Sequence, residues 1–75
     1  MKLNEFIELF AGEFDETPAD QFKPNTPYKE LEEWDSLAAL SVIAMVDEEM
    51  EKRVVGADIR NSNTIEELFK IIQNK

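Results

Sequence analysis

Trp34-Asp35-Ser36-Leu37 is the stretch that decides the fold, because a connection rich in proline and acidic residues ends here and an apolar helix begins. Its aspartate and serine are both residue types whose short side chains satisfy the free N–H groups of a first helical turn. From Leu37 to Val46 every residue except Ser41 is apolar, and such a helix needs a partner for more than one face. We therefore predict a helix over about 36–52, with one face in the core and another free for a second molecule.

The two sides of this helix carry different residues. The side expected to meet the core is an apolar stripe of Ala39, Val42, Ile43, Val46 and Met50. The opposite side is expected to be exposed, and it carries Leu37, Leu40, Ser41, Ala44 and Glu48. The run Asp47-Glu48-Glu49-Met50-Glu51 ends the helix, where acidic side chains oppose the helix dipole. We interpret this acidic patch as a surface that serves something other than helix stability.

Length and composition restrict the classes of function. A chain of 75 residues makes one small domain, residues 1–75. It has no cysteine and no histidine, which excludes Ser-His and Cys-His nucleophile pairs and most zinc sites. The acidic run from Asp47 to Glu51 lies in a predicted helix and lacks the glycine and the alternating ligands of a calcium-binding loop. We therefore predict a protein that is not an enzyme and that binds no metal.

The charge of the chain favours basic protein partners. Seventeen acidic residues against eight basic ones give a net charge of −9 at pH 7. Nucleic acid and anionic membrane surfaces are poor partners for such a chain, whereas a basic protein surface is a good one; plain solubility explains the acidity equally well. The N-terminus has no apolar run typical of a signal peptide, and no stretch is long enough to span a membrane. We expect a cytoplasmic monomer that binds neither nucleic acid nor membrane.

The first 35 residues predict one helix and a long connection. Apolar residues recur at helical spacing over about 3–14, which predicts an amphipathic helix with a core stripe of Leu3, Phe6, Ile7, Phe10 and Phe14. Residues 15–35 carry all three prolines, and a single turn is expected at 18–22. Apolar anchors spaced through this connection favour an ordered loop, and they are Phe22, Tyr28, Leu31 and Trp34. We expect Trp34 to lie as a lid on the core beside the second helix.

The C-terminal part predicts one short helix and one regular helix. Gly56 is expected in a turn, followed by a short helical turn over 57–60 that packs Ile59 inward. Thr64-Ile65-Glu66-Glu67 is a capping box, and the apolar residues behind it recur at helical spacing to about residue 73. No segment alternates like a strand. The predicted fold is therefore all-α, a small four-helix bundle of three main helices and one short one.

With its elements in this order, the chain resembles the acyl carrier protein family, which includes peptidyl and D-alanyl carriers. The stretch Thr26–Leu37 resembles the family's approach to the second helix: a threonine, an aromatic residue two positions on, a leucine, and then Asp35-Ser36-Leu37. Asp47–Met50 followed by Val54 resembles the acidic end of that helix, and Thr64-Ile65 resembles the start of the family's last helix. Chain length, acidity and the order of four helices agree with the same family.

This resemblance implies a carrier. In the family a separate phosphopantetheinyl transferase joins phosphopantetheine to the serine of Asp-Ser-Leu, which is Ser36 here. The thiol of that arm then carries an acyl group as a thioester and presents it to acyl-loading and acyl-using enzymes of fatty-acid, polyketide or related biosynthesis. The resemblance places the basic docking surfaces of these partners against Asp35, Leu37, Glu48 and Glu49. The expected exposed side of the second helix adds Leu40, Ser41 and Ala44 to this candidate docking surface.

Three departures from the family's pattern indicate a narrower role. Glu33 stands where many fatty-acid members have glycine, and Ala38 and Ser41 stand where they have acidic residues. We therefore expect a carrier dedicated to a small pathway more than the housekeeping fatty-acid carrier. An aminoacyl, peptidyl or D-alanyl carrier is the alternative within the family. The alternative of another class is an acidic helical adaptor for a basic protein, in which Ser36 serves only as an N-cap.

Overall fold

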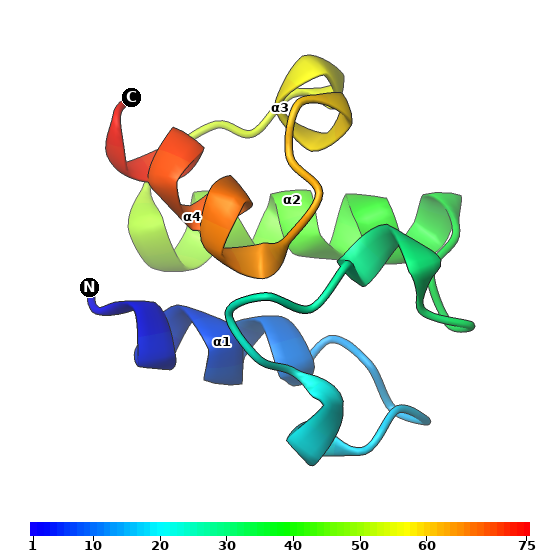
Figure 1. Cartoon of the computed structure of the whole chain (residues 1–75). Helices are drawn as coiled ribbons and strands as arrows, with labels where there is room; N and C mark the ends of the chain where they lie inside the picture. The colour runs from blue at the N-terminus through cyan, green and yellow to red at the C-terminus, as the bar shows by residue number, and fades with distance from the viewer.

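Four α-helices and two short 3₁₀ turns make up the computed structural model, which describes residues 1–75 and contains no strand. The helices are α1 (Leu3–Ala11), α2 (Ser36–Met50), α3 (Gly56–Arg60) and α4 (Ile65–Gln73), and the turns are η1 (Ala19–Gln21) and η2 (Tyr28–Glu30). α1 and α2 run in opposite directions (Figure 1). α1 packs against both α2 and α4, and α3 packs against α4. The prediction of an all-α fold with three main helices and one short one is confirmed.

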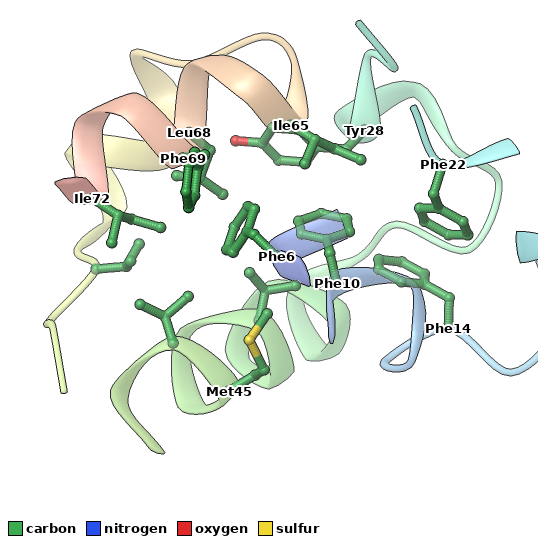
Figure 2. Packing of buried hydrophobic residues seen from close by; sticks show 13 residues of the cluster. Phe6, Phe10, Phe14, Phe22, Tyr28, Met45, Ile65, Leu68, Phe69 and Ile72 are labelled. Atoms are coloured by element: carbon green, nitrogen blue, oxygen red, sulfur yellow. The ribbon is translucent and has the colours of Figure 1, made fainter. Parts of the chain in front are cut away.

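An aromatic cluster forms the centre of the core (Figure 2). Phe10 of α1 is fully buried, and its ring centroid lies 5.4 Å from those of Phe14 and Tyr28 and 6.1 Å from that of Phe22. α2 and α4 close the cluster with buried side chains of their own, namely Val42, Met45, Val46, Ile65, Leu68, Phe69 and Ile72. Burial of one large apolar side chain contributes about 1.5–3 kcal/mol. The cluster is therefore the main source of stability in this small domain.

α1 ends at Ala11, three residues before the predicted end. The N–H of Gly12 still donates four residues back, but the N–H groups of Glu13 and Phe14 donate only three residues back, at 3.1 and 3.0 Å. The chain therefore tightens into a turn after Gly12. Phe14 is buried nonetheless, because this turn brings its ring onto the aromatic cluster.

The core stripe of α1 is narrower than predicted. Phe6 and Phe10 are fully buried, as expected. Leu3 and Ile7 are only half-buried. Both still pack against the core cluster, so the predicted stripe is confirmed as a contact surface but is fully buried only at Phe6 and Phe10 within α1.

α2 begins at Ser36, as predicted, and ends at Met50, two residues before the predicted end. The cap residue Glu51 has φ 55° and ψ 36°, a left-handed conformation that costs free energy in a residue with a side chain. Helices commonly end on such a residue, and glycine usually occupies it. This left-handed cap stops the helix before Lys52.

The core side of α2 is rotated from the predicted stripe. Val42 and Val46 are fully buried, as predicted, but the third buried residue is Met45, which the predicted stripe did not include. The long, flexible thioether side chain of methionine suits an irregular space beneath aromatic rings. Ala39, by contrast, is half-buried and lies outside the core cluster. Ser41 is also half-buried, and the predicted exposure is confirmed at Leu37, Leu40, Ala44 and Glu48.

The connection between α1 and α2 is ordered by Thr26, which is buried. Its Oγ1 accepts the N–H of Lys23 at 2.8 Å and donates to the carbonyl of Gln21 at 2.8 Å, which fixes the turn after η1. Its own carbonyl accepts the N–H of Ile65 at 3.3 Å and so joins the connection to α4. The prediction of an ordered loop is confirmed, with η1 inside the predicted turn at 18–22.

α3 is held by polar contacts more than by apolar burial, since none of its residues is fully buried. The buried Ser62 hydroxyl lies 2.6 Å from the Tyr28 hydroxyl and donates to the carbonyl of Asp58 at 3.0 Å. Burial raises the pKa of Tyr28, so its phenol stays protonated in this pair. α3 includes Gly56 as its first residue, and the prediction of a turn at that residue is wrong.

Lys75 contacts both the segment that follows α2 and the start of α3. Lys75 Nζ pairs with Asp58 Oδ2 at 2.8 Å, and the backbone carbonyl of Lys75 accepts a hydrogen bond from Lys52 Nζ at 2.7 Å. The hydrogen bond from Lys75 and a second one from the N–H of Val55 lower the pKa of Asp58. The charged carboxylate of Asp58 therefore fixes both the start of α3 and the C-terminus.

α4 begins and ends where predicted, at Ile65 and Gln73. Thr64 Oγ1 accepts the N–H of Glu67 at 3.2 Å, as a capping box requires. The return contact is shifted by one residue, because the carboxylate of Glu67 accepts the N–H of Asn63 at 2.7 Å. The helix start is therefore satisfied by two side-chain contacts.

Thr64→Ala is expected to destabilise the protein, because it removes the oxygen that accepts the N–H of Glu67. Loss of an N-cap costs about 1 kcal/mol, which corresponds to a melting temperature lower by roughly 4–8 °C in a domain of this size. Thr64→Ser keeps the oxygen and should melt close to the parent. Thermal melts followed by far-UV circular dichroism measure the difference. Equal melting of Thr64→Ala and the parent would show that this cap contributes nothing.

Candidate functional site

Asp35, and not Ser36, caps the start of α2. Asp35 has an extended backbone, and its Oδ1 accepts the N–H of Ala38 at 2.8 Å. Its carbonyl accepts the N–H of Ala39 at 3.0 Å, which is the first hydrogen bond of the helix. Ser36 is the first residue inside the helix, its side chain is exposed, and its hydroxyl makes no hydrogen bond within the chain. The alternative in which Ser36 serves as the N-cap is therefore wrong on this point.

The backbone around Ser36 suits an esterified anion. The N–H groups of Ser36 and Leu37 have no acceptor within the chain. Free N–H groups and the helix dipole together favour negative charge at a helix N-terminus. A phosphodiester on Ser36 Oγ would lie beside these groups, so the modified side chain would be stabilised where it attaches.

Trp34 supports the start of α2 from the side of the core. It is half-buried, and its ring centroid lies 6.3 Å from that of Phe14 and 5.0 Å from that of Tyr28. Its predicted place as a lid on the core is confirmed. Since Phe14 and Tyr28 belong to the aromatic cluster, the segment leading into Ser36 is anchored to the core.

Glu33 ties the two ends of the long connection together. Its Oε1 accepts the Thr17 hydroxyl at 2.6 Å and the N–H of Glu16 at 3.1 Å. The hydrogen bond from Thr17, together with those from backbone N–H groups, lowers the pKa of Glu33 and keeps it charged. Thr17 and Glu33 are 16 residues apart, and no local pattern in the sequence indicates this pair. Glu33 therefore has a structural role in this chain.

The exposed side of α2 beyond Ser36 is apolar first and acidic further along. Leu37 and Leu40 are 73% and 60% exposed, which is high for large apolar side chains. Residues spaced by three or four share one side of a helix, so Leu37, Leu40, Ala44 and Glu48 form one stripe. Exposed apolar groups rimmed by charge are typical of surfaces that bind proteins. Asp35 and Glu49 are exposed as well, and Ser41 alone among the predicted docking residues is half-buried.

The chain offers Ser36 no group that would activate it as a nucleophile. It has neither histidine nor cysteine, and a serine hydroxyl without an adjacent base is a weak nucleophile. No three His, Cys, Asp or Glu side chains converge in a way that could hold a metal ion.

Comparisons of the chain with protein-family models, with curated proteins and with solved structures returned no match. Among the helices, none is both long enough and apolar enough to cross a membrane.

Proposed function

We propose that the protein is an acyl carrier, which holds an acyl group as a thioester on a phosphopantetheine arm attached to Ser36. The observation that carries the proposal is the separation of two roles at the start of α2. Asp35 caps the helix, while the Ser36 hydroxyl is exposed and unbonded. The Asp35-Ser36-Leu37 match and the order of four helices support the same family. If the protein were only an adaptor, the exposed Ser36 would have no role, because Asp35 and not Ser36 is the N-cap residue of α2.

Attachment of the arm is one balanced group transfer, catalysed by a separate phosphopantetheinyl transferase. Ser36 Oγ attacks the coenzyme A phosphorus that bears the pantetheine chain, a phosphodiester forms, and the P–O bond to the adenosine bisphosphate breaks. The serine proton goes to a base of the transferase, since this chain has no histidine or cysteine. The arm, when attached, supplies the thiol that a cysteine-free chain lacks.

The exposed side of α2 supports a particular kind of partner enzyme. Leu37 and Leu40 provide apolar contacts close to the attachment site, and Glu48 and Glu49 provide negative charge further along. A partner enzyme that is complementary to this side of α2 would have an apolar patch next to basic residues. We propose that such enzymes load and use the acyl group, and that the first half of α2, which is apolar and has no acidic residue, dedicates the carrier to a small pathway.

Intact-mass spectrometry tests the proposed function directly. The purified chain is incubated with coenzyme A and a phosphopantetheinyl transferase of broad specificity, and a mass increase of one phosphopantetheine group is expected. Peptide mapping should place the added mass on Ser36. The same incubation without transferase should leave the mass unchanged. If the chain gains no mass under conditions that fully modify a known carrier, the proposal is wrong.

Leu40→Ala and Glu48→Lys should weaken docking in different ways. Charges at the rim of an interface mainly set the association rate, whereas apolar anchors mainly set dissociation. Glu48→Lys should therefore lower the transferase kcat/KM about threefold at low salt and flatten its dependence on salt. Leu40→Ala should lower kcat/KM by about tenfold at every salt concentration. Modification rates measured across a salt series distinguish the two variants. If Leu40→Ala and Glu48→Lys showed the same dependence on salt, α2 would not be the docking surface.

A further inference from the structure

A groove lies along α1, between this helix and the residues that lead into and follow η1. Its volume is about 580 Å³, which is within the range of ligand-binding clefts. The apolar part of its lining consists of Ile7, Ala11, Phe14, Ala19 and Phe22. Ile7 and Ala11 are four residues apart on α1, and both are half-buried. Both residues pack partly against the core, and the apolar surface that they leave uncovered faces the groove.

The surroundings of this groove are acidic. Glu8 is the one charged residue in its lining. From residue 4 to residue 22 the chain has no lysine or arginine, and its acidic residues there are Glu5, Glu8, Glu13, Asp15, Glu16 and Asp20. All six are exposed, and none forms an ion pair, because the one ion pair of the structure joins Lys75 and Asp58. The groove therefore combines an apolar floor with an acidic rim, by which we mean Glu8 in the lining and the exposed carboxylates that neighbour the lining residues in the sequence. Lys23, which follows Phe22, is the one basic residue directly next to a lining residue in the sequence.

We propose that this groove is a docking site for a basic amphipathic segment of a partner protein. The apolar side chains of the segment would fill the groove, and its lysine and arginine residues would meet the acidic rim. The negative charge of the groove disfavours two other kinds of occupant. Glu8 would repel an anionic ligand. A second copy of the chain would bring the same acidic rim and would therefore be repelled as well. The complementary partner is therefore basic as well as apolar.

Two contacts connect the groove to the approach to Ser36. Phe14 in its wall stacks on Trp34, and Thr17 in its wall donates to the carboxylate of Glu33. A segment seated in the groove would therefore lie against side chains that support the start of α2. The docking site itself does not depend on attachment of an arm to Ser36, so the two proposals are tested separately.

An NMR titration with a designed peptide tests this docking site. The probe is a synthetic helical peptide with leucine and lysine at amphipathic spacing, and the matched probe has glutamate in place of every lysine. The basic peptide should shift the amide signals of Ile7, Gly12, Thr17 and Ala19, and added salt should weaken its binding. The acidic peptide should leave these signals unchanged.

Gly12→Leu fills the groove without straining the backbone. Gly12 has φ −63°, and a Cβ there meets only backbone oxygens of Leu9 and Glu8, at 3.4 and 3.5 Å, which is ordinary contact. The variant should fold and bind the basic peptide at least about tenfold more weakly. Ala19→Lys places a positive charge in the groove and should weaken binding as well. The exposed Gln73 of α4 lies outside the groove, and Gln73→Leu should bind as the parent does.

Three results would overturn the docking site. Amide shifts confined to the acidic end of α2 would place the peptide at Glu48 and Glu49 instead. Parent-like binding by both Gly12→Leu and Ala19→Lys would show that the groove is not occupied. If the acidic peptide bound as tightly as the basic one, the acidic rim would contribute nothing to binding. Since phosphopantetheine attachment to Ser36 is measured by mass, each of these results leaves the proposed carrier function intact.

Discussion

Ser36→Ala is expected to abolish phosphopantetheine attachment while leaving the protein folded. The side chain of Ser36 is exposed and makes no hydrogen bond within the chain, so its removal costs no contact. The cap is retained, because Asp35 Oδ1 still accepts the N–H of Ala38. An exposed substitution of this kind changes stability by less than about 0.5 kcal/mol. The melting temperature should therefore stay within about 4 °C of the parent value, whereas the mass increase should be lost completely.

Asp35→Ala is the matched variant, because it removes the cap and keeps the hydroxyl of Ser36. It should destabilise the protein by about 1 kcal/mol. Ser36 should still be modified to completion, although more slowly, because Asp35 also belongs to the candidate docking surface. Ser41→Ala should be modified as the parent is. Thermal melts and intact mass, measured on the same samples, separate the two roles. A mass increase on Ser36→Ala would end the carrier hypothesis in its present form.

Phe10→Ala should have the largest effect on stability. Phe10 is fully buried, and its ring contacts those of Phe6, Phe14, Phe22 and Tyr28. Truncation of a buried phenylalanine to alanine costs about 3–5 kcal/mol. For 75 residues the whole free energy of unfolding is about 4–11 kcal/mol. The melting temperature should therefore fall by roughly 12 °C or more, and a large part of the population should be unfolded at body temperature.

Leu9→Ala is the control for this variant. Leu9 precedes Phe10 on the same helix but is only half-buried, so its truncation leaves a smaller cavity. Leu9→Ala should cost less than about half as much as Phe10→Ala. Urea unfolding followed by circular dichroism gives both free energies. Similar values for the two variants would show that the aromatic cluster does not dominate stability.

The parts of the fold that the sequence predicted well are those set by local chemistry. Asp35 at the start of α2 and Thr64 at the start of α4 are caps followed by apolar residues at helical spacing, and both helices begin where predicted. Ser36 is a candidate site because of Asp35-Ser36-Leu37 together with the order of the elements around it, and the structure places its side chain on the surface. Helix ends were less predictable. Glu51 takes a left-handed conformation that no residue type in that region indicates.

The features that depend on distant contacts could not be read from the sequence. Met45 entered the core in place of Ala39 because the rotation of α2 is set by the side chains of α1 and α4, not by its own apolar pattern. Ile7 packs against the core, as expected, but it is only half-buried and also lines the groove. The spacing of apolar residues on α1 is the same for either side, so periodicity alone does not show which side the core covers.

Trp34 has a further consequence for how this protein is studied. It is the only tryptophan in the chain, it is half-buried, and it lies two residues before Ser36. Indole fluorescence responds to the water around the ring, so its emission reports on the immediate surroundings of Ser36. A partner that covers the exposed part of the ring would shift the emission to shorter wavelengths. Rapid mixing would then give association rates for the unlabelled protein, with an optical reporter that the chain already contains.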